Sequence, residues 1–134
     1  LKPILNSKFV IRNSLVLRRL AEGEKFVILA NLPYGWQAWK NNCSLDTIGL
    51  KFEPPVALFT GKHGLELYEK LFKQIRMLSV MPYGLCDITV LCEFDPRQTK
   101  MIKKLIKREL PNAKCQIKKD LAGLNRLAII TIKA

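Results

Sequence analysis

The sequence contains the stretch Lys25-Phe26-Val27-Ile28-Leu29-Ala30-Asn31-Leu32-Pro33-Tyr34, in which a nearly continuous apolar run ends in a polar corner. Continuous apolar character over this length is typical of a parallel strand that is covered on both faces. Ligands of open α/β sheets bind beyond the carboxyl ends of such strands. The stretch therefore predicts a buried strand at 25–30 and a candidate ligand site at 31–34.

Segments on both sides of this stretch alternate between strand-like and helix-like patterns. Strands are predicted at 8–12, 85–94, 115–119 and 126–132, and helices at 64–78 and 97–110. The region 35–60 has no sustained period and is predicted to be irregular, with one short helix. Asp95 and Pro96 suit the N-cap and the first position of the second helix. The order of elements indicates a single α/β domain over residues 1–134 with one antiparallel edge strand.

The composition indicates a folded domain with a strong positive charge. Of the 134 residues, 49% are hydrophobic, which is enough for a real core. There are 23 Lys and Arg against 11 Asp and Glu, so the formal net charge is +12. Such an excess favours anionic partners such as RNA or a ribosomal surface.

The basic residues of the predicted helix 97–110 recur with helical spacing. They are Lys100, Lys103, Lys104, Lys107 and Arg108, and the apolar stripe opposite them consists of Met101, Ile102, Leu105 and Ile106. This pattern suits either a solvated helix face or a face that contacts phosphates.

Several classes of protein are disfavoured by the residues present. No apolar run is long enough to cross a membrane, and residues 1–3 lack the apolar run of a signal peptide, so a cytoplasmic protein without membrane contact is expected. The four Cys include no C-x-x-C pair and there is one His, so no metal site is expected. The thiols are predicted to be reduced, with Cys86 and Cys92 buried on one face of a strand.

The corner at 31–34 has the groups needed to hold a planar amino or amide nitrogen. An Asn side chain offers an acceptor oxygen, so Asn31 and the backbone carbonyl of Leu32 or Pro33 could accept both hydrogens of an NH2 group. Tyr34 could then stack on the planar group, and positioning alone would supply much of the rate. The alternative is a plain corner, in which Pro33 ends the strand and Tyr34 packs.

An N-[P/L]-P-Y corner after a buried strand resembles the signature of S-adenosylmethionine-dependent amino-group methyltransferases. Leu32 in second place is more like the rRNA adenine dimethyltransferases. The longer block 52–68, Phe-Glu-Pro-Pro-Val-Ala-Leu-Phe-Thr-Gly-Lys-His-Gly-Leu-Glu-Leu-Tyr, resembles that of the release-factor glutamine N5-methyltransferases. Segments 93–98 and 119–126 resemble the E-x-G-x-x-Q and K-D-x-A-G-x-x-R segments of that family, with Asp95 in place of a glycine and His63 in place of an acidic residue.

The resemblance implies a partial Rossmann-like class I methyltransferase sheet with a C-terminal antiparallel hairpin. It implies methyl transfer from S-adenosylmethionine to the glutamine amide of the GGQ motif in a peptide chain release factor. In that reaction Asn31 would orient the amide and contact the cofactor, the backbone at Leu32 and Pro33 would complete the clamp, and Tyr34 would pack against the substrate. Ser14 stands near the family's acidic residue beside the cofactor adenine, where its lack of charge would weaken that contact.

The family's glycine-rich cofactor turn has no counterpart here, because the seven glycines include no G-x-G. We therefore expect the chain to be the C-terminal portion of a catalytic domain that lacks the cofactor-binding half, to bind S-adenosylmethionine weakly or not at all, and to self-associate through uncovered sheet edges. Two alternatives stay open: an rRNA adenine N6-methyltransferase, and a degenerate non-catalytic module that binds RNA or the ribosome.

Overall fold

The computed structural model describes residues 25–36, 54–61, 63–79 and 87–133. The strand predicted at 8–12, the candidate cofactor contact Ser14 and the predicted buried thiol Cys86 lie outside the described residues.

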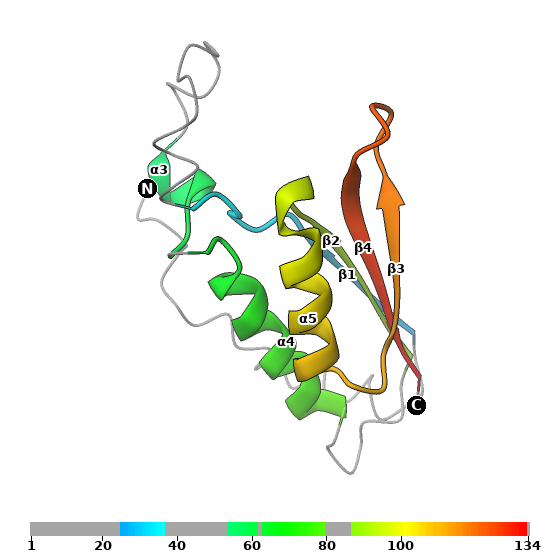
Figure 1. Ribbon diagram of the computed structural model, residues 1–134. Helices are drawn as coiled ribbons and strands as arrows, with labels where there is room; N and C mark the ends of the chain where they lie inside the picture. The colour runs from blue at the N-terminus through cyan, green and yellow to red at the C-terminus, as the bar shows by residue number, and fades with distance from the viewer. Residues whose placement is uncertain (1–24, 37–53, 62, 80–86, 134) are drawn as a thin grey trace.

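A single four-stranded sheet carries the described fold (Figure 1). Its strands are β1 (Phe26–Ala30), β2 (Ile88–Glu93), β3 (Lys114–Lys119) and β4 (Asn125–Ile132), arranged in the order β1-β2-β4-β3. β1 and β2 are parallel, whereas β4 is antiparallel to both β2 and β3. The predicted α/β class and the C-terminal antiparallel hairpin are confirmed.

The prediction that the antiparallel strand lies at the edge of the sheet is wrong. β4 lies between β2 and β3, and β3 is the edge strand. The residues of the two strands explain why β4 is the inner strand and β3 the edge strand. β4 alternates buried Ala128, Ile130 and Ile132 with half-buried residues, so it suits an inner position. β3 is mostly exposed and contains three lysines, which suits an edge because charged side chains discourage pairing with other chains.

Two helices, α4 (Glu66–Ser79) and α5 (Thr99–Glu109), cover one face of the sheet (Figure 1). The core between them and the sheet contains Phe72 and Ile75 of α4, Ile102 of α5, and Val90 and Ile130 of the sheet, all completely buried. These helices confirm the sequence periodicity at 64–78 and 97–110. The structure describes no helix that is long and apolar enough to cross a membrane.

Two short turns of helix complete the described elements. α3 (Pro55–Leu58) is the short helix expected in the irregular region. The 3-10 turn η1 (Pro96–Gln98) precedes α5, and Asp95 caps this turn in a capping box with Gln98. The prediction that Asp95 caps the helix itself is corrected, because α5 begins at Thr99 with Gln98 as its N-cap.

The opposite face of β1 is uncovered, which corrects the prediction of a strand covered on both faces. Val27 is 64% exposed and Leu29 is 78% exposed, because α4 and α5 both lie on the other side of the sheet.

The predicted apolar stripe of α5 needs one correction as well. Met101 is 42% exposed, so only Ile102, Leu105 and Ile106 of that stripe face the core.

Candidate functional site

The corner 31–34 lies at the carboxyl end of β1, next to the end of β2. The parallel register pairs Ala30 with Cys92, so Asn31 and Glu93 follow at the same level. The Asn31 side chain is exposed and, within the part of the chain that the structure describes, has no hydrogen-bond partner. Leu32, Pro33 and Tyr34 are half-buried. The amide of Asn31 is therefore available to an incoming group, while the residues after it are packed.

Tyr68 of α4 fixes the start of this corner from inside the core. Its hydroxyl lies 3.2 Å from the Ala30 carbonyl oxygen and accepts the Leu32 N–H at 3.2 Å. It also hydrogen-bonds the Glu93 carbonyl oxygen, so one buried hydroxyl joins α4 to the ends of β1 and β2. Burial raises the pKa of Tyr68 far above its usual value, so the phenol stays protonated and neutral.

Gln98 fixes the end of the corner. Its side-chain nitrogen donates to the carbonyl oxygens of Tyr34 at 2.8 Å and His63 at 2.9 Å. Its side-chain oxygen accepts the Asp95 N–H at 3.2 Å. The residue is 2% exposed, so these bonds satisfy a buried amide that would otherwise be costly. Gln98 thereby ties η1 both to the corner and to the turn before α4.

The backbone segments around Gln98 approach closely at Gly64, and Gly35 joins them by backbone hydrogen bonds. Gly64 has φ +74°, and a Cβ there would lie 2.0 Å from the Tyr34 carbonyl oxygen. The N–H of Gly35 donates to the Leu58 carbonyl oxygen at 2.8 Å, and its own carbonyl accepts the Thr60 N–H at 2.9 Å. The corner is therefore held by α4, by η1 and by the segment that follows α3.

The Tyr34 hydroxyl donates to a Glu93 carboxylate oxygen at 3.3 Å. Burial, followed by the charge of Glu93, raises the pKa of Tyr34, so the phenol is a neutral donor at physiological pH. This bond fixes the direction of the ring that the sequence assigned to substrate packing.

An ion pair beside the corner holds Trp36. The Asp95 carboxylate accepts the side-chain Nε and Nη2 of Arg97, each at 2.8 Å, and the guanidinium lies 4.8 Å from the centre of the Trp36 ring. Burial of Asp95 opposes its ionisation, but the bonds from the Arg97 side chain and backbone outweigh it and lower its pKa. The aspartate that departs from the family pattern thus has a structural partner, Arg97.

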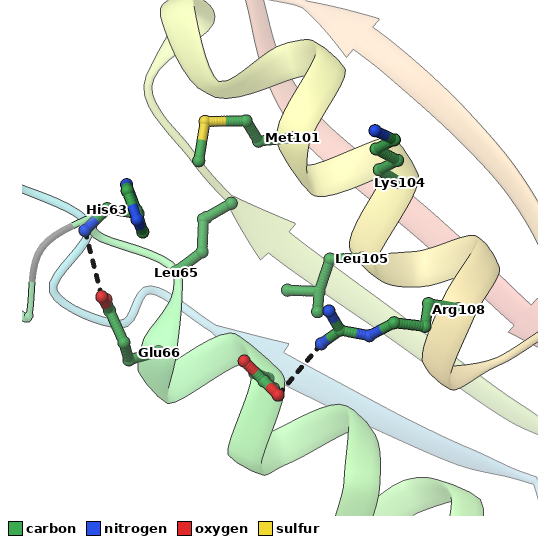
Figure 2. Close-up of a pocket in the computed structure, with 8 residues that line it drawn as sticks. His63, Leu65, Glu66, Met101, Lys104, Leu105 and Arg108 are labelled. Carbon is green, nitrogen blue, oxygen red and sulfur yellow. Dashed lines mark hydrogen bonds and ion pairs between the residues drawn. The ribbon is translucent and has the colours of Figure 1, made fainter.

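Two surface hollows lie away from the corner. The larger, about 550 Å³, runs between α4 and α5, with Leu65 and Leu105 among its apolar residues (Figure 2). An ion pair of 3.0 Å between Glu69 and Arg108 crosses it. The smaller, about 320 Å³, lies between the end of α5 and Cys115. Neither hollow includes Asn31, so both hollows are separate from the candidate clamp.

No family model matches the chain. The release factor glutamine methyltransferase of Enterococcus faecalis is 28% identical over 114 residues, which are 84% of this chain and 38% of that protein. The chain is therefore similar in sequence to a release factor glutamine methyltransferase over most of its length. It spans well under half the length of that relative.

A solved structure of a release-factor-specific protein-(glutamine-N5) methyltransferase from Alicyclobacillus acidocaldarius is also similar to the chain. It is 18% identical, covers 90% of this chain and 88% of its own, and superposes with a TM-score of 0.39.

The sequence alone assigned no role to Tyr68, Glu93 or Gln98, although the methyltransferase-like segments contain all three. Their contacts with residues 30–34 show that these separate segments meet at one corner. The proximity of Glu93 to the corner could have been predicted from the sequence, since parallel strands that end in polar residues bring those residues to one edge of a sheet. The contact from α4 depends on how that helix packs, which a linear pattern does not give.

We expect the close approach at Gly64 to make it far less tolerant of substitution than Gly123. Both have a positive φ, +74° and +76°, but a Cβ at Gly123 meets nothing within 4 Å. G123A should therefore cost about 1–2 kcal/mol from backbone conformation alone. G64A should cost about 1–3 kcal/mol more, because the corner must move away from the added methyl group. Urea unfolding of both variants measures the difference, and equal losses would contradict the contact with Tyr34.

The Asp95–Arg97 pair should make stability depend on pH in a defined direction. The folded-state pKa of Asp95 is lowered, so its contribution is present above the unfolded value of about 3.9 and is lost as the pH falls through the folded value. D95N keeps a capping side chain but removes the charge. It should be less stable than wild type at neutral pH, with the gap closing below about pH 4. A gap that does not change between these pH values in urea titrations would refute this.

Proposed function

We propose that this chain provides the amide-binding part of an S-adenosylmethionine-dependent N-methyltransferase that acts on a glutamine side chain of a peptide chain release factor. The similarity to a release factor glutamine methyltransferase supports the reaction class. The single observation that carries the proposal is the exposed amide of Asn31, which has no partner among the described residues, on a corner whose backbone is fixed by Tyr68 and Gln98.

The arrangement suits capture of a primary amide. An acceptor glutamine presents an NH2 group, whose two hydrogens require two acceptors. Asn31 supplies one through its side-chain oxygen, and a backbone carbonyl at Leu32 or Pro33 supplies the other. Because the Leu32 N–H is bonded to the Tyr68 hydroxyl, the peptide planes of the corner have little freedom to turn. A fixed pair of acceptors holds the amide nitrogen in one orientation, which lowers the entropic part of the barrier.

Tyr34 forms the wall of this clamp in the proposal. Its hydroxyl is bonded to Glu93, so the ring cannot swing freely across the corner. The Asp95–Arg97 pair holds Trp36 nearby, with the guanidinium over the indole ring. Two aromatic side chains with fixed directions would limit which substrates can bring a planar amide to Asn31.

S-adenosylmethionine, when bound, supplies the electrophilic methyl group. Of the residues that the family resemblance links to this cofactor, the structure describes Asn31, and neither hollow described above reaches it. The described residues around Asn31 therefore offer acceptors to an amide, and neither of the two hollows offers a cofactor pocket beside them. The part of this chain in the reaction is to bind and orient the amide.

Calorimetric titration with a release factor tests the clamp. N31A should weaken binding about fivefold, since one hydrogen bond to an amide contributes about 1 kcal/mol. The matched control is N112A, which removes another exposed asparagine far along the chain and should bind as wild type does. Equal affinities of wild type and N31A would show that the amide binds elsewhere. A parallel titration with S-adenosylmethionine should show weak binding or none.

We also propose that the uncovered face and edge of β1 pair with a second copy of the chain. β1 is the first strand of the described sheet, so one of its edges has no neighbouring strand there, and Val27 and Leu29 stand exposed beside it. An exposed apolar strand with a free edge favours association between chains.

Light scattering over a concentration series tests this association. The wild-type mass should rise above the 15.4 kDa of one chain, and V27T/L29T should shift it back toward that value while keeping strand propensity. The control L121T/L124T removes two exposed leucines from the hairpin loop and should behave as wild type. A wild-type protein that stays monomeric throughout would contradict the pairing.

A further inference from the structure

The exposed side of α5 carries a row of positively charged side chains. We define the basic ridge as Lys100, Lys103, Lys104 and Lys107, all of which are exposed. None of the four makes an ion pair within the described parts of the chain. The one acid of α5, Glu109, is buried and bonded to Arg108 at 2.6 Å, so it does not neutralise the ridge.

The ridge does not serve the stability of α5. Lys100 and Lys104 are four residues apart, as are Lys103 and Lys107, and like charges at this spacing destabilise a helix by about 0.2–0.5 kcal/mol per pair. Lys100 also stands in the first turn, where a positive charge opposes the helix dipole and where α5 has no acidic residue. A bound anion would relieve both penalties.

The two hollows described above flank the ridge. Lys104 lines the larger hollow, which has Leu65 and Leu105 among its apolar residues (Figure 2). Lys103 and Lys107 line the smaller hollow on the other side of α5. Apolar residues of that hollow are Ile106, Leu110, Pro111 and Ala113. The positive charges therefore stand along a helix with a hollow on each side. The larger hollow also has the carboxylates of Glu66 and Glu69 in its lining, and Glu69 is paired with Arg108.

We propose that the basic ridge binds single-stranded nucleic acid, with phosphates on the lysines and bases in the flanking hollows. Lysine neutralises phosphates effectively but is depleted in protein interfaces, whose cores need large apolar or aromatic anchors. The only large apolar side chain of α5 that is exposed is Met101, at 42%, which is too little for such a core. The ridge and the Asn31 corner share no residue, so this binding is independent of the proposed methyl transfer.

Fluorescence anisotropy with a labelled oligouridylate of about 12 nucleotides, within the usual site size for single strands, tests the ridge. K103Q/K107Q should weaken binding about tenfold and reduce the slope of log affinity against log salt by about 1.4, because each phosphate contact on a single strand contributes about 0.7. The matched control is K73Q/K133Q, which removes the same net charge from lysines already paired with Glu69 at 2.6 Å and Asp87 at 2.5 Å. The control should bind within about twofold of wild type.

Three outcomes would overturn the proposal. Equal losses in both double variants would mean that only net charge matters. Competition by polyglutamate as effective as by unlabelled oligouridylate would point to an acidic protein partner. No binding of the wild type at low salt would remove the site altogether. Urea unfolding separates these from misfolding, since K103Q/K107Q should be at least as stable as wild type. N31A should bind the oligouridylate unchanged, whatever its effect on release factor binding.

Discussion

The buried hydroxyl of Tyr68 joins three segments that are far apart in the sequence: α4, the end of β1 with the corner that follows it, and the end of β2. It contacts the last residue of β1, the second residue of the corner and the last residue of β2, all from a helix on one face of the sheet. Because the hydroxyl is buried, each group that it contacts would lose a partner in the core if it moved. The direction of the corner backbone is therefore set by the packing of α4.

Gln98 is the second fixed point, and it holds the other end of the corner through buried hydrogen bonds as well. Its buried amide has to be satisfied, and the groups that satisfy it belong to the corner, to the turn before α4 and to η1. Gly64 makes this possible, because a side chain there would occupy the space of the Tyr34 carbonyl. Asn31 lies between the two fixed points, and its side-chain amide has no partner among the described residues. The corner thus combines a constrained backbone with one available polar group.

The sequence predicted most of the described elements because their signals are local. The apolar run at 26–30, the helical periods of α4 and α5, and the capping pair of Asp95 and Pro96 all act within a few residues. The position of β4 inside the sheet was not predicted, because strand order follows from which strands bury most apolar surface, a comparison between distant segments. Exposure of Val27 and Leu29 was missed for a related reason, since an apolar run shows what could be covered and not what covers it.

The candidate site shows the same difference between local and long-range signals. The corner 31–34 could be found from its residue types and its place after a strand, whereas the contacts of Tyr68 and Gln98 are long-range and depend on the packed helices.

The inner position of β4 also affects the order in which the sheet can form during synthesis. Ile88 pairs with Ile132, so β2 cannot gain its second neighbour until residues 125–132 have been synthesised, and they must then fit between two strands that precede them in the chain. Such non-local pairing slows folding, so on the ribosome the sheet can be completed only after residues 125–132 have been made.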